Sequence, residues 1–84
     1  MKIDSQVCLA PIQNAVSRTK NRIRENGPAF IVLSEPKTTQ FDRHGQRWIL
    51  FESVAHNTSD GHGGKEAWFG WLPVKEIEVI SESR

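Results

Sequence analysis

The sequence predicts a single α+β domain spanning residues 1–84, with one N-terminal amphipathic helix, over about residues 11–26, packed on a strongly curled antiparallel sheet of four to five strands. Three observations predict this class. One stripe of apolar residues at helical spacing stands near the N-terminus, and everything after Pro28 has the composition of short strands and turns. The length leaves room for one hydrophobic core only.

The helix is predicted from a narrow apolar stripe and two boundary signals. Pro11 suits the first helical position, where its missing N–H has no helical partner. Gly27 is expected to end the helix in a left-handed conformation, and Pro28 cannot continue it. The stripe repeats every three to four residues, through Ile12, Val16, Thr19 and Ile23, with Ala15 beside them.

The rest of the chain alternates between β-rich runs and turn signals. A proline at position 36 interrupts the first long run, and Asp42 and Gly45 occupy the ends of a predicted type I hairpin turn. A glycine-rich loop is expected over residues 56–65. The predicted strands cover residues 29–34, 46–54, 66–72 and 77–80, with a further first strand over 3–9. Residues 37–42 are expected to continue the run of 29–34 beyond a bulge or at an edge of the sheet.

The strands are unusual because apolar residues are consecutive rather than alternating. Successive side chains of a strand point to opposite faces, so the runs 30–33, 48–51 and 68–72 place apolar side chains on both faces of the sheet. A helix of about 16 residues is about 24 Å long and covers one face. The second face is then buried by curling into a barrel, by a second copy of the chain, or by a ligand.

The C-terminal segment resembles one known family. Gly70-Trp71-Leu72-Pro73, with Val74 and Ile77 leading into a closing strand, is similar to the end of SH3 domains, where a G-W-x-P stretch precedes a single helical turn and the last strand. The resemblance implies a small SH3-like barrel. It does not extend to recognition of Pro-rich peptides, because the acidic and paired-tryptophan motifs for that activity are not evident.

Composition restricts the protein's location and chemistry. Cys8 is the only cysteine, and no apolar stretch approaches the length of a membrane span, so we expect a cytoplasmic protein without disulfides or membrane contact. The loop before Lys65 is not a phosphate-binding P-loop, because a strand rather than a helix follows it. We expect no catalytic residue, no cofactor and no metal site: the candidate ligands lack ligand spacing, namely Cys8, His44, His56, Asp60 and His62.

Two sets of residues are candidates for binding. The first is aromatic, and it favours a non-catalytic binding or assembly module that forms a homodimer through a sheet face: Trp48, Trp68, Phe69 and Trp71. The second is basic, and it favours phosphate contacts in a nucleic-acid-binding protein: Arg18, Arg22, Arg24, Arg43, Arg47 and Lys65. The net charge of +1 argues against a strong overall basic field. A small-molecule-binding barrel is the third alternative.

Overall fold

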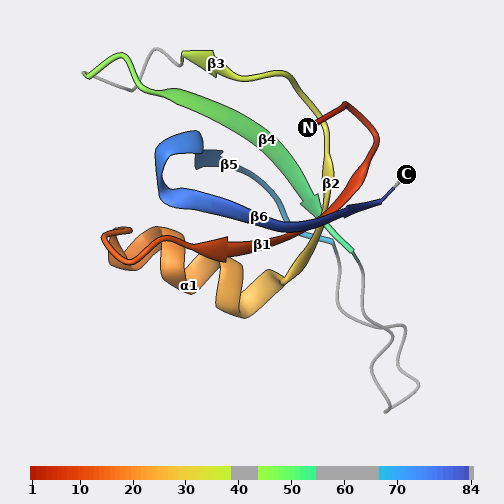
Figure 1. Ribbon diagram of the computed structural model, residues 1–84, viewed down its shortest axis with the longest axis horizontal. Coiled ribbons are helices and arrows are strands. Elements are labelled where there is room, and N and C mark those ends of the chain that lie inside the picture. Colours follow the sequence, from red (N-terminus) through yellow and green to blue (C-terminus); the bar gives the residue numbers. More distant parts are fainter. Residues whose placement is uncertain (39–43, 55–66, 84) are drawn as a thin grey trace.

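One antiparallel sheet and one α-helix make up the described part of the protein (Figure 1). The computed structural model describes residues 1–38, 44–54 and 67–83. Within these ranges the elements follow the order β1 (Gln6–Pro11), α1 (Ser17–Asn26), β2 (Ala29–Val32), β3 (Lys37–Thr38), β4 (Arg47–Ser53), β5 (Phe69–Pro73), the 3₁₀ turn η1 (Val74–Glu76) and β6 (Ile77–Ser83). The predicted α+β class is confirmed.

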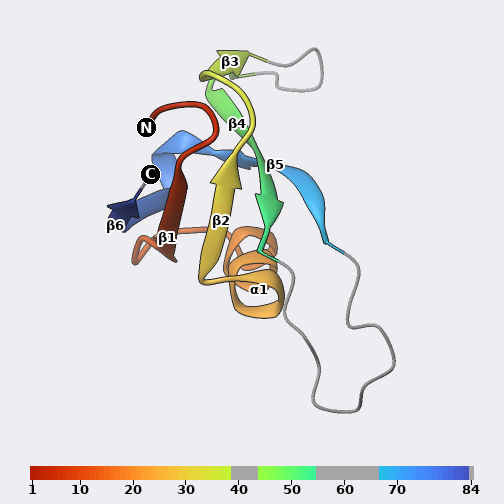
Figure 2. The ribbon, with the colours of Figure 1, turned by 90° about the vertical axis from the view of Figure 1, so that its right-hand side faces the viewer.

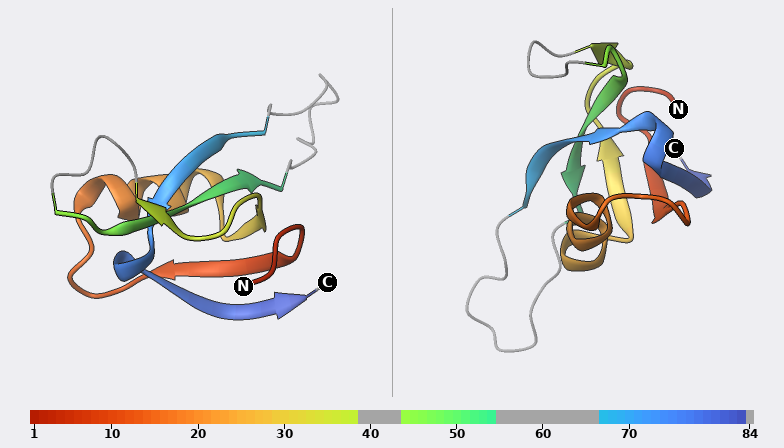
Figure 3. Two further views of the ribbon diagram at one scale, coloured as in Figure 1. Left: turned by 90° about the horizontal axis from the view of Figure 1, so that it is seen from above. Right: turned by 90° about the vertical axis from the view of Figure 1, so that its left-hand side faces the viewer.

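The strand order places β5 and β6 at the two ends of the sheet. The path runs β3-β4-β2-β1-β6, and β5 pairs with the other side of β4. All pairings are antiparallel. Figure 2 shows β6 at one side of the sheet and β5 at the other, and Figure 3 shows β6 running beside β1. Although η1 alone separates β5 from β6 in the chain, the two strands pair with different neighbours.

The predicted count of four to five strands is wrong, because the described sheet has six. The run after Pro28 divides into β2 and β3. Between them the N–H of Leu50 donates to the hydroxyl of Ser34 at 3.0 Å, and Pro36 has no N–H to give. The Ser34 hydroxyl thus takes the place of a backbone carbonyl as the acceptor for the Leu50 N–H. Backbone pairing with β4 resumes only at Lys37, which stands opposite Trp48.

The predicted strong curl of the sheet is not found either. Closing a sheet requires bulges or glycine kinks at several positions. The ladders of the described strands contain a single register shift, between Cys8 and Leu9 in the pairing of β1 with β6. No ladder joins β5 to β6. Within the described residues the sheet therefore keeps two separate edges, β5 and β6.

The helix begins six residues later than the sequence predicts. Pro11 is the last residue of β1, opposite Ile77, and α1 starts at Ser17. The bonds between β1 and β2 end at Leu9, whose N–H donates to the carbonyl of Pro28 at 2.9 Å. Pro11 lies beyond this point in β1, so the N–H that proline lacks is not needed for a bond to β2. Val16, which the predicted stripe includes, is 54% exposed.

The end of α1 also differs from the expectation. Gly27 is extended, with φ of −97°, and is not left-handed. Its N–H donates to the carbonyl of Ile23 at 2.7 Å. Glycine is needed here for space, because a Cβ would lie 2.6 Å from Cε2 of Phe30 and 2.7 Å from that same carbonyl oxygen.

The core lies between one face of the sheet and α1. Thr19 and Ile23 of α1 are buried, as predicted, and the rings of Phe30 and Phe51 meet edge to face at a centroid distance of 5.8 Å. Along β1, β2 and β4 every second residue is buried on this side, and β5 and β6 add Leu72 and Ile77. Its members are Val7, Leu9, Ile23, Phe30, Val32, Ile49, Phe51, Leu72 and Ile77.

The other face of the sheet is apolar along β2, β4 and β5. Leu50 stands opposite Trp71 in the ladder, and Leu50 and Ile31 are only half-buried. Phe69 and Trp71 are 60% and 40% exposed. The prediction of two apolar faces is confirmed, and the second face is left partly open at the β5 end.

The predicted hairpin turn over residues 42–45 falls partly, and the glycine-rich loop over 56–65 entirely, outside the described residues.

Candidate functional site

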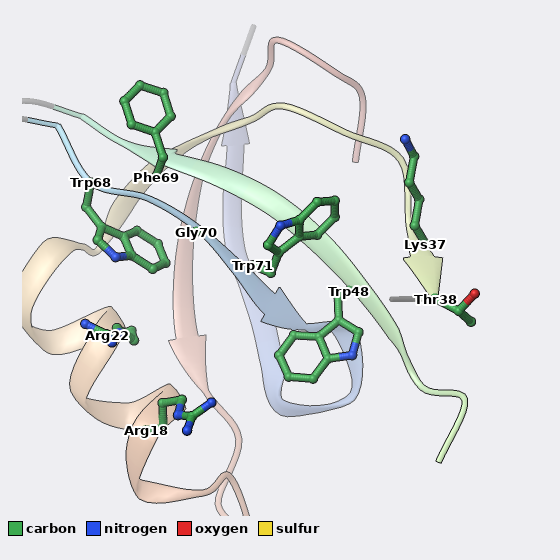
Figure 4. A pocket seen from close by; sticks show the side chains of 9 residues that line it. All are labelled: Arg18, Arg22, Lys37, Thr38, Trp48, Trp68, Phe69, Gly70 and Trp71. Atoms are coloured by element: carbon green, nitrogen blue, oxygen red, sulfur yellow. The ribbon is translucent and has the colours of Figure 1, made fainter. Parts of the chain in front are cut away.

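A groove lies across the free edge of β5, with a volume of about 770 Å³ (Figure 4). Four elements contribute side chains to it: α1 on one side, β5 in the middle, and β3 and β4 on the other side. We call it the edge groove. Its lining residues are Arg18, Arg22, Lys37, Thr38, Trp48, Trp68, Phe69, Gly70 and Trp71.

The edge groove continues toward the start of α1. A second hollow of about 490 Å³ shares Arg18, Arg22, Trp48 and Trp71 with it and reaches Glu76. The two hollows are therefore neighbouring parts of one elongated surface. A volume of several hundred cubic ångströms is within the range of ligand-binding sites.

Trp68 forms a fixed wall of the edge groove. Its ring meets Phe30 edge to face at 6.1 Å, and its backbone N–H donates to the Ser53 hydroxyl at 2.7 Å. The ring lies over Gly70, where any Cβ would collide with it. The guanidinium carbon of Arg22 is 6.0 Å from the ring centroid, within cation–π range. Trp68 is therefore held by the core on one side and by α1 on another.

Phe69 and Trp71 form the exposed apolar part of the groove. They are two residues apart on β5, so they share the sheet face opposite Trp68. Trp71 stands opposite Leu50 and Phe69 opposite Glu52 in the ladder. Large apolar side chains left exposed next to each other are typical of a contact surface.

The outer edge of the β5 backbone carries no strand within the described part of the chain. Among the described strands β5 pairs only with β4. The N–H of Ser53 donates to the carbonyl of Trp68 at 2.8 Å. Because hydrogen bonding alternates along an antiparallel ladder, this bond turns the N–H and C=O groups of Phe69 and Trp71 away from β4. Such an edge is a template for another strand.

The charge of the edge groove is positive. Arg18, Arg22 and Lys37 line it with exposed side chains, and none of its described lining residues is acidic. Glu76, in the neighbouring hollow, accepts hydrogen bonds from the Val16 N–H at 2.9 Å and the Thr19 hydroxyl at 3.0 Å. Its carboxylate is therefore already bonded to the start of α1.

The structure brings the two predicted residue sets together. All four predicted aromatic residues, Trp48, Trp68, Phe69 and Trp71, line the edge groove, and so do two of the predicted cations, Arg18 and Arg22. The sequence reasoning missed Lys37 and Thr38, whose place beside Trp48 depends on the pairing of β3 with β4. It also missed Gly70, although a glycine two residues from a tryptophan in a strand is a signal for close packing.

Two other predicted cations, Arg24 and Arg47, do not line this groove. Arg24 donates to the side-chain oxygen of Asn21 at 2.8 Å on α1, and Arg47 is exposed at the start of β4. Arg43 and Lys65 lie outside the described residues.

The remaining side chains considered for chemistry are the Cys8 thiol and the possible metal ligands. Cys8 is a half-buried free thiol. No group of three or more His, Cys, Asp or Glu side chains gathers within the described ranges, and His56, Asp60 and His62 lie outside them. Among the residues that the structure describes, no helix has the length and apolar character needed to cross a membrane.

The comparisons with known proteins return no relative: the chain matches no protein-family model, no curated protein and no solved structure at a significant level. The SH3-like resemblance stays a prediction. The C-terminal segment does form a strand, a single 3₁₀ turn and a final strand, but these elements alone do not define the family.

Proposed function

We propose that this protein is a non-catalytic binding and assembly module whose edge groove holds an extended, acidic polypeptide segment. The segment would add a strand to the free edge of β5. The observation that carries this proposal is the open backbone of Phe69 and Trp71, bordered by aromatic and basic side chains.

An added strand fits both the backbone and the side chains of the groove. The N–H and C=O groups of Phe69 and Trp71 offer main-chain hydrogen bonds to a partner. The exposed rings of the same two residues stand beside the partner's alternate side chains. Main-chain bonds supply affinity that depends little on sequence, and the rings select the apolar positions.

The cations select an acidic partner. Arg18 and Arg22 border β5 from the helix side, and Lys37 borders it from the side of β3 (Figure 4). An anionic segment between them gains attraction from both sides, and a cationic one is repelled. Arg22 is also positioned by the Trp68 ring, so less side-chain freedom is lost when it pairs.

Single-stranded nucleic acid is the second candidate, favoured by the same combination of cations and aromatic rings. Two observations place it second. The ring of Trp68 packs over Gly70 and against Phe30, so it does not offer a free face for base stacking. The open β edge gives hydrogen bonds in the geometry of a peptide ladder, which a nucleotide chain does not match.

A tryptophan-fluorescence titration tests the proposal. The probes are an acidic peptide of alternating Val and Glu, the matched peptide of alternating Val and Lys, and an oligothymidylate, each of about ten residues. We expect the acidic peptide to change the emission and to saturate, with weaker binding as salt increases. The Lys peptide serves as the control. Binding of neither peptide would overturn the proposal, and binding of the oligothymidylate alone would establish the second candidate.

A further inference from the structure

The sheet has a second open edge, β6, whose charge is opposite to that of the edge groove. Among the described strands β6 pairs only with β1. Its exposed side chains include the carboxylates of Glu78 and Glu82 and the apolar Val79 and Ile80, which are 38% and 63% exposed. β6 is thus itself an extended, acidic segment with apolar side chains, the kind of partner that the edge groove suits.

We infer that the segment bound in the edge groove is β6 of a second copy of this chain. The inference rests on the proposed function and names its partner. Arg18, Arg22 and Lys37 of one copy would face Glu78 and Glu82 of the next. The exposed Ile80 has no partner in the β1 ladder, where Ser81 and Val79 pair with consecutive residues, so its side chain is available to Phe69 and Trp71.

The contact joins two different surfaces of the molecule. Within one copy β5 is bonded to β4 and β6 to β1, and no ladder joins β5 to β6. Each copy therefore presents both the edge groove and the acidic edge of β6. Such a head-to-tail contact generates a closed ring if the rotation between copies closes, and an open chain of copies if it does not. A simple two-fold dimer is not the expected product.

The strength of the contact is limited by the short paired length. β5 has five residues and β6 has seven, so a shared ladder covers at most five pairs. Interfaces of this size are typical of weak association. We expect assembly at about 100 μM chain and above, with monomers at lower concentration and at high salt.

Two variants with one damaged surface each test the inference by static light scattering at fixed chain concentrations between about 10 μM and 1 mM. The groove variant carries Arg18→Glu and Phe69→Pro, which reverse a charge and remove an outward N–H. The edge variant carries Glu78→Lys and Ile80→Lys on β6. All four positions are exposed, and circular dichroism checks that both variants are folded.

We expect the wild type to form species larger than a dimer as concentration rises, and each variant alone to stay monomeric. An equimolar mixture should give one-to-one dimers, because the intact β6 of the groove variant fits the intact groove of the edge variant. A two-fold interface gives a different result: the variant that keeps the interface dimerises by itself.

Three results would overturn the inference: a wild type that stays monomeric at about 1 mM, an edge variant that assembles like the wild type, or a mixture that stays monomeric. If the acidic peptide still saturates the groove of a monomeric wild type, the proposed function stands and only the identity of its partner is wrong. If neither the peptide nor a second copy binds, both proposals fail.

Discussion

The carboxylate of Glu76 accepts a hydrogen bond from the hydroxyl of Thr19 at 3.0 Å, although 57 residues separate the two in the chain. The same carboxylate accepts the N–H of Val16 at 2.9 Å. Val16 is the N-cap residue of α1 and supplies no side-chain cap of its own. Glu76, in the turn η1 between β5 and β6, therefore caps the start of α1 in place of a residue next to the helix in the chain.

Replacing Glu76 should destabilise the fold through this cap. We expect Glu76→Ala to lower the free energy of unfolding by about 1–2 kcal/mol, as for the loss of a helix cap. Glu78→Ala, which removes an exposed carboxylate two residues away, should change it by less than about 0.5 kcal/mol. Urea denaturation of both variants measures the difference. Equal effects would mean that Glu76 does not act as the cap.

Adding one methyl group at Gly70 should displace Trp68. A Cβ at Gly70 would collide with the Trp68 ring, so we expect Gly70→Ala to cost about 1–3 kcal/mol of stability and to shift tryptophan emission to longer wavelength.

The double variant Gly70→Ala/Trp68→Leu provides the control for this collision. It should lose less stability than the two single variants added together, because the smaller side chain leaves room for the methyl group. Strict additivity would show that the two residues do not press on each other.

The outward N–H of Phe69 should matter for binding and not for stability. Phe69→Ala and Phe69→Pro both remove the exposed ring, but only the proline removes the N–H, and proline is tolerated at the first residue of an edge strand. We expect free energies of unfolding, measured in urea, that agree within about 0.5 kcal/mol. The acidic-peptide affinity should be at least about threefold lower for Phe69→Pro than for Phe69→Ala. Equal affinities would exclude strand addition at this edge.

The position of a cation on α1 should decide its effect on binding. Arg18 lines the edge groove, whereas Arg24 bonds to Asn21 and does not. Arg18→Glu should weaken binding of the acidic peptide by about tenfold at low salt, and Arg24→Glu, with the same change in net charge, by less than about threefold. A similar loss from both variants would indicate attraction by overall charge instead of by the groove.

The start of the helix shows where local sequence signals are ambiguous. Pro11 is equally suited to the first turn of a helix and to the end of a strand, and the apolar stripe extends through Ile12 and Val16. The choice depends on two distant bonds to Glu76: its backbone carbonyl accepts the Ile12 N–H at 3.0 Å, and its carboxylate takes the Val16 N–H. No window of local sequence contains this information.

The shape of the sheet could also not be predicted from the sequence pattern. Consecutive apolar residues in β2, β4 and β5 correctly predict two apolar faces, because side chains alternate along any strand. Whether such a sheet closes depends on register shifts and bulges between strands, and the described ladders have only one. The predicted number of strands was wrong for a similar reason. The break between β2 and β3 depends on the Ser34 hydroxyl, which accepts the Leu50 N–H in place of a backbone carbonyl.

The sequence by itself determined the α+β class, the apolar runs, the buried positions Thr19 and Ile23, and the aromatic and basic residues suited to binding, because these follow from local spacing and side-chain chemistry. Only the tertiary structure decided that the four aromatic residues share one groove with Arg18 and Arg22, and that β5 and β6 are edges of opposite charge among the described strands. It also decided that the Glu76 carboxylate bonds to the N-cap residue of α1. These features depend on which strands pair and where α1 lies against them. Pairing over such sequence distances is set by the packing of the whole chain.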